Sequence, residues 1–186
     1  MATRPGLRRF ALTAHVVSSV GWLGAVAVFL ALSVVGLTSD DPEVIRAAYI
    51  AMESIGWLVL VPLSFASLVT GLIQSLGTKW GLARHYWVLA KLLINLAATV
   101  VLVLYMGTLD HLAGLASATA ASGAIFEGLR NPSPVLHAGV GLLLLLAAAG
   151  LSVYKPRGMT RYGQRQQRRQ RGASSRAQVG EGGMRR

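Results

Sequence analysis

Four apolar stretches, each long enough to cross a lipid bilayer, restrict the fold of this chain more than any other feature. They cover residues 9–37, 46–76, 85–108 and 134–154. A helix rises about 1.5 Å per residue, so about 20 apolar residues cross the roughly 30 Å hydrocarbon layer. Each stretch is therefore expected to be a transmembrane helix. The predicted fold is an all-α, four-helix transmembrane bundle.

The composition agrees with a membrane protein and excludes several kinds of site. Of the 186 residues, 53% are hydrophobic and 13% are charged, which is too apolar for an ordinary soluble domain. Four spans use most of the chain, so no second folded domain is expected. Cysteine is absent, which excludes disulfides, thiolate nucleophiles, iron–sulfur ligation and cysteine-attached haem. Any metal would have to be held by His, Met, Asp or Glu.

The charges between the stretches predict their orientation. One side of the membrane would carry the basic residues Arg4, Arg8, Arg9, Lys79, Arg84, Lys155, Arg157 and Arg161. The other side would carry mainly acidic residues, namely Asp40, Asp41, Glu43, Asp110 and Glu127, with Arg46 and Arg130 as its basic residues. Cytoplasmic loops have an excess of Lys and Arg. Both termini are therefore expected to be cytoplasmic, in a multi-pass protein of the plasma membrane whose first stretch is retained because it exceeds a signal sequence in length.

Two segments outside the stretches differ from each other in character. Residues 109–133 form an outer loop that could hold a short interfacial helix, and His111 in this loop could approach a site in the outer half. Residues 1–158 are assigned to the transmembrane domain. Residues 159–186 are rich in Gln, Arg, Gly and Ser and predict a disordered cytoplasmic tail. The net charge of +11 gathers in this tail and at the helix ends, which favours anionic lipid headgroups over nucleic acid as a partner.

Four ionisable side chains lie within the stretches: His15, Glu53, Lys91 and His137. In hydrocarbon, such a group costs at least about 2.5 kcal/mol, so each one needs an interior partner, a cavity or a route to the interface. Counting the helical rise puts His15 and Lys91 about 8 Å inside the cytoplasmic boundary, with Glu53 and His137 in the outer half. Two polar layers are therefore predicted, one in each leaflet. His85 lies at the inner interface.

Helical spacing predicts that these side chains face the interior of the bundle. In the second stretch the spacing is a strict alternation of four- and three-residue steps through Glu53, Trp57, Leu60, Ser64, Ser67, Gly71 and Gln74. The faces of the other stretches contain His15, Ser18, Ser19, Trp22, Val26 and Phe29; Arg84, Lys91, Asn95 and Thr99; and His137, Gly141, Ala148 and Ser152. Pro62 predicts a kink in the second stretch, for which simple curvature is the alternative.

The chemistry of the interior residues leaves two interpretations open for each. His15 and His137 are candidate haem or metal ligands because neutral imidazole offers a lone pair to iron. The alternative is a histidine that joins helices by hydrogen bonds to Ser or Asn. Lys91 either extends to the aqueous boundary or presents a positive charge to a cofactor propionate or anionic substrate. Glu53 is too short to reach water, so it is expected to pair with His137 or to be protonated, with proton transfer as its candidate role.

Two motifs resemble a known group of small bacterial membrane proteins. The residues from His15 to Gly24 are similar to a His-x6-Trp-x-Gly signature of HemJ-type protoporphyrinogen oxidases and CopD-type copper-resistance proteins. The segment from Trp87 to Leu92 resembles the Trp-x3-Lys-Leu pattern of the same families. The resemblance implies that His15 matches a haem b ligand and that Lys91 matches a functionally required lysine. It ends at Tyr105, which precedes Met where HemJ-type proteins have His, so the oxidase reaction is not carried over.

Along its whole length the chain is most similar to an uncharacterised actinobacterial family of four-helix integral membrane proteins, a resemblance that includes His137 and residues 151–158. This family implies no particular activity. The expected function is b-type haem binding for a redox or accessory role, with His15, Lys91 and His137 binding the cofactor and the two histidines as metal ligands. The alternatives are a small proton- or metal-linked transporter or transport accessory that uses Glu53, and a structural subunit of a homo-oligomer or larger membrane complex.

Overall fold

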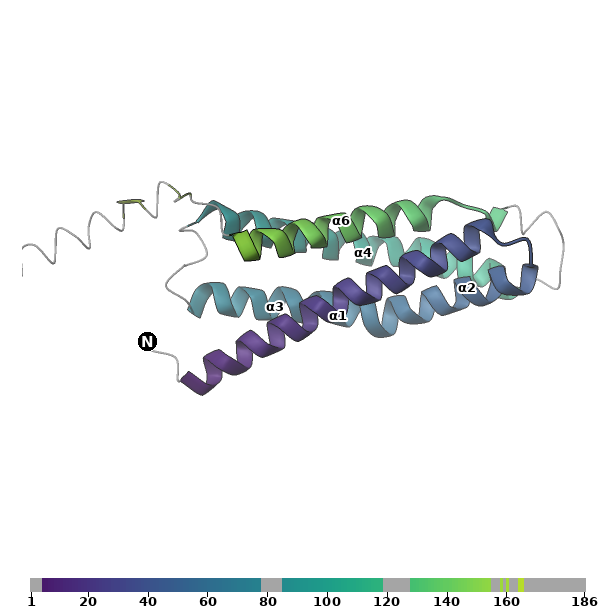
Figure 1. Ribbon diagram of the computed structural model, residues 1–186. Helices are drawn as coiled ribbons and strands as arrows, with labels where there is room; N and C mark the ends of the chain where they lie inside the picture. The colour runs from purple at the N-terminus through teal and green to yellow at the C-terminus, as the bar shows by residue number, and fades with distance from the viewer. Residues whose placement is uncertain are drawn as a thin grey trace, which may run out of the picture.

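A computed structural model of the chain describes residues 5–77, 85–118, 128–154, 158, 160, 164 and 165. Within them the chain forms a bundle of long helices that lie side by side (Figure 1). The elements are α1 (Pro5–Thr38), α2 (Pro42–Ile55), the π-helical turn η1 (Gly56–Leu60), α3 (Val61–Gly77), α4 (Tyr86–Ala118) and α6 (Ser133–Tyr154). No β-strand occurs among the described residues. The predicted all-α, four-helix fold is confirmed.

The described residues contain four spans that are long and apolar enough to cross a membrane. These spans are Gly6–Thr38, Pro42–Leu76, Tyr86–Ala118 and Ser133–Tyr154. Large apolar side chains cover their outward faces: Phe10, Leu58 and Leu104 expose 72%, 77% and 74% of their surface. Hydrocarbon solvates such a surface, whereas water does not. The structure is that of a multi-pass membrane protein.

The charged residues gather at the two ends of the bundle. We call one end the basic end; it holds the start of α1, the end of α3, the start of α4 and the end of α6 (Figure 1). The opposite, acidic end holds the turn from α1 to α2 and the start of α6. There Arg130 pairs with Asp40, and Tyr49 donates a hydrogen bond of 2.5 Å to the Leu129 carbonyl. The segment before α6 is thereby joined to the first two helices.

The third span is longer than predicted. The sequence predicts a helix that ends at Thr108, but α4 continues to Ala118. Its added turns bury the apolar residues Leu109, Leu112, Ala113 and Ala116, and this spacing of three and four residues continues an interior helix face. The first part of the predicted loop 109–133 is therefore helical. Residues 119–127 and most of the predicted tail 159–186 lie outside the described residues.

The second span, Pro42–Leu76, contains the π-helical turn η1 near its middle. The N–H of Val61 bonds to the carbonyl of Gly56, five residues earlier, and Pro62 follows directly. Proline has no N–H to donate, so a regular helix would be interrupted here in any case. A π-turn is one of the recognised causes of a helix irregularity. The irregularity in this span is a π-turn directly before Pro62, and the kink predicted from Pro62 stays a prediction.

The π-turn changes which residues of the second span face the interior. Upstream of the turn, Met52 and Gly56 occupy the buried face in place of Glu53 and Trp57, whereas Leu60 and Ser64 are buried as predicted. Trp57 is instead 46% exposed, and its Nε1 donates to Asp110 Oδ1 at 2.8 Å. Glu53 is only partly buried. The predicted interior face is therefore wrong at Glu53 and Trp57, because a regular alternation of steps assumes an uninterrupted α-helix.

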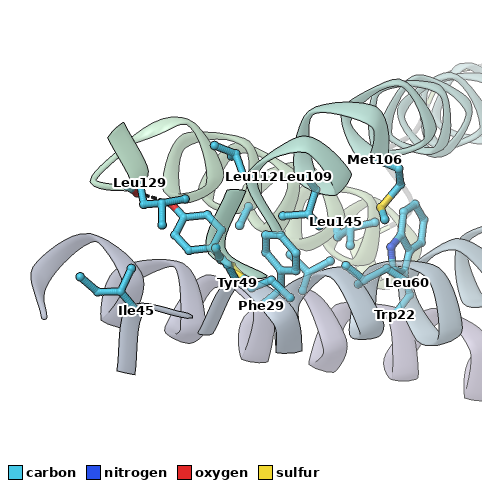
Figure 2. Packing of buried hydrophobic residues seen from close by; sticks show 14 residues of the cluster. Trp22, Phe29, Ile45, Tyr49, Leu60, Met106, Leu109, Leu112, Leu129 and Leu145 are labelled. Carbon is cyan, nitrogen blue, oxygen red and sulfur yellow. Dashed lines mark hydrogen bonds between the residues drawn. The ribbon is translucent and has the colours of Figure 1, made fainter. Parts of the chain in front are cut away.

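The apolar core occupies the half of the bundle toward the acidic end. Figure 2 shows its side chains interlocking between α1, the second span, α4 and α6. Its buried members are Trp22, Val26, Phe29, Ile45, Tyr49, Met52, Leu60, Met106, Leu109, Leu112, Ala116, Leu129, Ala138 and Leu145. In the half near the basic end, polar side chains make contacts between the helices.

Gly56 allows α4 to approach the π-turn closely, and this can be tested. A Cβ at Gly56 would lie 2.6 Å from Met106 Cε and 2.8 Å from its Sδ. We expect Gly56→Ala to lower the free energy of unfolding by about 1–3 kcal/mol, the usual cost of overpacking. Gly139→Ala is the control, because a Cβ there meets no atom within 4 Å. Unfolding in detergent, followed by circular dichroism, measures both; equal stability of the two variants would contradict this account.

Candidate functional site

Polar side chains from all four spans meet in the half of the bundle near the basic end. We call this group the polar cluster; its members are His15, Ser18, Ser19, Ser67, Thr70, Lys91, Asn95 and Ser152. They belong to α1, α3, α4 and α6. Each lies on or beside the face of its helix that packs against a neighbouring helix. The helical packing therefore brings together residues that are far apart in the sequence.

His15 is held by α3 through the Nδ1 atom of its ring. The side chain is 8% exposed, and its Nδ1 lies 3.2 Å from the Ser67 carbonyl oxygen and 3.2 Å from Thr70 Oγ1. Because a carbonyl only accepts, the Ser67 contact requires the hydrogen on Nδ1 and leaves a lone pair on Nε2 of the neutral ring. A Cβ at Gly71 would lie 3.0 Å from His15 Cε1, so a glycine is what lets α3 pack against the ring.

Lys91 meets the other side of the imidazole. Its Nζ donates to Ser152 Oγ at 2.6 Å and lies 3.4 Å from His15 Nε2. Among the described residues, no carboxylate lies within ion-pair distance of Lys91. The ammonium group is therefore bound by neutral partners inside the bundle, and it does not extend to the interface as one of the two sequence interpretations would have it.

The His15–Lys91 contact favours a single positive charge shared by two nitrogens. With hydrogen on Nδ1, the lone pair of His15 Nε2 points to the side on which Lys91 donates. If both groups were charged, two unit charges 3.4 Å apart would repel by about 5 kcal/mol at an effective dielectric constant of 20. The pair is suited to taking up and releasing one proton.

Polar residues continue from this pair toward the middle of the membrane along α4. Asn95 and Thr99 follow Lys91 at four-residue steps, each about 6 Å further along the axis. Both are buried, with 6% and 3% of their surface exposed. Among the described residues, the Thr99 hydroxyl has no hydrogen-bond partner. The column thus ends in a hydroxyl group that can still donate or accept.

The predicted outer layer does not form as a Glu53–His137 pair. His137 Nδ1 lies 2.9 Å from the Ser133 carbonyl oxygen, and the ring stacks on Tyr105 with centroids 4.0 Å apart and planes 20° apart. No hydrogen bond or ion pair joins Glu53 to His137, both of which are described. His137 is also exposed, contrary to the predicted interior position. The π-turn and the aromatic partner explain why the two groups do not meet.

His15 and His137 cannot ligate one iron. Lys91 contacts both His15 and Ser152, so these two residues lie at about the same position along the bundle axis. His137 precedes Ser152 by 15 positions on α6. At about 1.5 Å per residue, this places His137 roughly 22 Å further along the bundle, whereas axial haem ligands face each other across one iron. The candidate donors therefore do not fit a bis-histidine haem. No group of three or more His, Asp or Glu residues that could hold a metal is found within the described part of the chain.

The remaining histidines lie apart from one another. His111 is exposed on α4, and His85 precedes α4 with its ring centroid 6.4 Å from that of Trp87. The contact of Ser152 with Lys91 and the stacking of Tyr105 on His137 were not predicted from the sequence. A depth count could have found the first contact, since both residues lie near the helix ends at the basic end. Ring stacking between helices leaves no comparable signal in the spacing.

Comparisons with protein-family models, with curated proteins and with solved structures gave no match for this chain. The resemblance of residues 15–24 and 87–92 to haem- and copper-related families therefore stays an expectation from sequence.

Loss of the Ser152 hydroxyl should destabilise the polar cluster. We expect Ser152→Ala to lower the free energy of unfolding by about 1.5–3 kcal/mol, because Lys91 loses a charge-assisted hydrogen bond. Ser75→Ala is the matched control, since its hydroxyl bonds to the Leu72 carbonyl on its own helix, and it should change stability by less than about 0.5 kcal/mol. Unfolding in detergent measures both variants. Equal effects would mean that Lys91 does not depend on Ser152.

Proposed function

We propose that this protein is a small proton transporter of the plasma membrane and that the His15–Lys91 pair is its proton-binding site. One observation carries the proposal: Lys91 Nζ lies 3.4 Å from His15 Nε2 and 2.6 Å from Ser152 Oγ. Ionisable groups inside a membrane are costly and commonly mark proton or substrate pathways. Two nitrogens that share one charge can exchange a proton without creating a second buried charge.

The polar column supports a route for the proton. Asn95 and Thr99 extend from Lys91 toward the middle of the membrane, and the Thr99 hydroxyl is unpaired among the described residues. Hydroxyl groups can both donate and accept, so they can pass a proton along a chain. Elsewhere in the spans most buried side chains are apolar, with Ser33 and Ser64 as buried polar residues, and a proton beyond Thr99 would need water or a carrier to continue.

Haem binding remains the alternative proposal, and an optical spectrum separates it from proton transport. A haem at His15 would need the Nε2 lone pair, which faces Lys91. Protein purified from haem-supplied cells would show a Soret band if haem is bound. A band that disappears in His15→Gln would favour haem and count against the proton-binding role of the pair.

We further propose that the basic end faces the cytoplasm and that the Arg-rich tail contacts anionic headgroups. Arg8 and Arg9 begin α1 at this end, whereas Asp40, Asp41 and Glu43 lie at the other. The positive-inside rule assigns basic ends to the cytoplasm. Under this assignment the His15–Lys91 pair lies in the inner leaflet and loads from the cytoplasm.

The orientation is testable because the chain has no cysteine. Pro132→Cys places a thiol at the acidic end, and Ser174→Cys places one in the tail sequence. In intact cells, a membrane-impermeant maleimide should label the first variant and should label the second only after the membrane is opened. The unsubstituted chain is the control. The reverse labelling pattern would overturn the orientation.

Proton flux tests the site directly. In liposomes that contain a pH-sensitive dye, the protein should carry protons down an imposed potential, and His15→Gln should lower the rate at least about tenfold, equivalent to about 1.4 kcal/mol in barrier height. Lys91→Arg should lower it as well, because Arg keeps the charge but does not release its proton.

The control for flux is His111→Gln, the same substitution at an exposed position on α4. It should leave the rate unchanged. A wild-type rate equal to that of protein-free liposomes would reject proton transport, and full activity of Lys91→Arg would make Lys91 a fixed charge instead of a proton-exchanging group.

A further inference from the structure

One buried side chain from each span contributes to a layer on the acidic side of the polar cluster. We call it the central layer; its members are Trp22, Leu60, Thr99 and Leu145, each of which is at most 7% exposed. Counted toward the acidic end, each lies seven or eight positions beyond a residue of the polar cluster on its own span, or about 10–12 Å along the axis. The pairs are His15 and Trp22, Ser67 and Leu60, Lys91 and Thr99, and Ser152 and Leu145. Because the polar members of these pairs contact one another, the central layer lies at about one level of the bundle.

A cavity of about 360 Å³ lies on the far side of the central layer. Three members of the layer, Trp22, Leu60 and Leu145, line this cavity and belong to the apolar core (Figure 2). The cavity reaches the flank of the bundle, where Val101 and Val140 line it and expose 51% and 56% of their surface. In a membrane-spanning bundle, this flank contacts hydrocarbon. The central layer therefore separates the polar cluster from an apolar space that is open to lipid.

The central layer is closed to water. Its two polar atoms, Trp22 Nε1 and Thr99 Oγ1, are inaccessible to solvent and make no hydrogen bond among the described residues. The rest of the layer consists of the indole ring and two leucine side chains, which offer a proton nothing to bind. Hydrophobic constrictions in channels stop ions in this way, because water does not fill them. The polar column of α4 therefore ends at a barrier, and the indole of Trp22 is its largest side chain.

We propose that the central layer is the gate of the proton pathway and that Trp22 closes it. In the closed conformation, the His15–Lys91 pair exchanges its proton only with the basic end. Displacement of the indole joins the polar column to the cavity, so that a proton can leave on the other side. The inference rests on the proposed function, because a gate acts only on something that is transported. The barrier itself is a property of the packing, and it can be measured whether or not the wild-type protein carries protons.

The gate is tested with the full chain in liposomes that contain a pH-sensitive dye. Trp22→Ser removes the indole and adds a hydroxyl group at the level of the Thr99 hydroxyl, so the opened space should hold water. We expect proton entry at least about tenfold faster than in the wild type, because a hydrated constriction no longer excludes the proton. Leu60→Ser opens the same layer from the second span and should also raise the rate. Should Trp22→Ser not fold, Leu60→Ser decides by the same measurement.

Two further variants serve as controls. Trp22→Phe keeps an apolar ring in the central layer and should carry protons as the wild type does. Phe29→Ser tests for loosened packing, because Phe29 is 5% exposed and lines the cavity but lies seven positions beyond Trp22 on α1. It should leave the rate unchanged. Circular dichroism and size-exclusion chromatography show whether each variant is folded, and retention of the dye shows that the liposomes are intact.

Two results would overturn the gate. One is a Trp22→Ser rate equal to that of the wild type. The other is an equal increase in Phe29→Ser, since general loosening of the core would then explain the flux. A failure of the proposed function looks different: if the wild type carries no protons while Trp22→Ser and Leu60→Ser do, the barrier at the central layer stands and proton transport by the wild type is rejected.

Discussion

Hydrocarbon offers no hydrogen bonds, and the rest of this structure depends on that constraint. Each span satisfies its own backbone as a helix, and polar side chains must find partners on other helices. The cluster around His15 does so with contacts from α3, α4 and α6. These contacts join helices whose outward surfaces are almost purely apolar. The polar side chains that join the helices near the basic end are also the ionisable and hydrogen-bonding groups of the candidate site there. Substitutions in the polar cluster are therefore expected to affect both stability and function.

The bundle divides along its axis into a polar half and an apolar half, and the boundary between them has consequences for mechanism. The polar column of α4 ends at Thr99, while the cavity begins with Trp22 and with neighbouring turns of α4. A proton that reaches the middle of the membrane would therefore meet an apolar space that is open to lipid.

Much of this arrangement could be predicted from sequence, for reasons visible at particular residues. The interior face of α1, from His15 through Trp22 to Phe29, follows regular helical spacing, and it is buried as expected. The helical rise also predicts that His15 and Lys91 lie at the same depth, and the two side chains are in contact. The second span could not be predicted in the same way, because the π-turn shifts its register and no spacing rule reports such a turn. The contacts of Ser152 and Tyr105 depend on how helices are rotated against each other, which side-chain packing decides.

The π-turn also sets how the two halves of the second span are oriented about a common axis. Each residue turns an α-helix by about 100°, so one additional residue at Gly56–Leu60 rotates α2 relative to α3 by that order. Deleting a single residue in this segment would return Glu53 and Trp57 toward the interior while leaving Ser67 and Gly71 against His15. Deletion of one residue would therefore rotate the Glu53 carboxylate toward the apolar core.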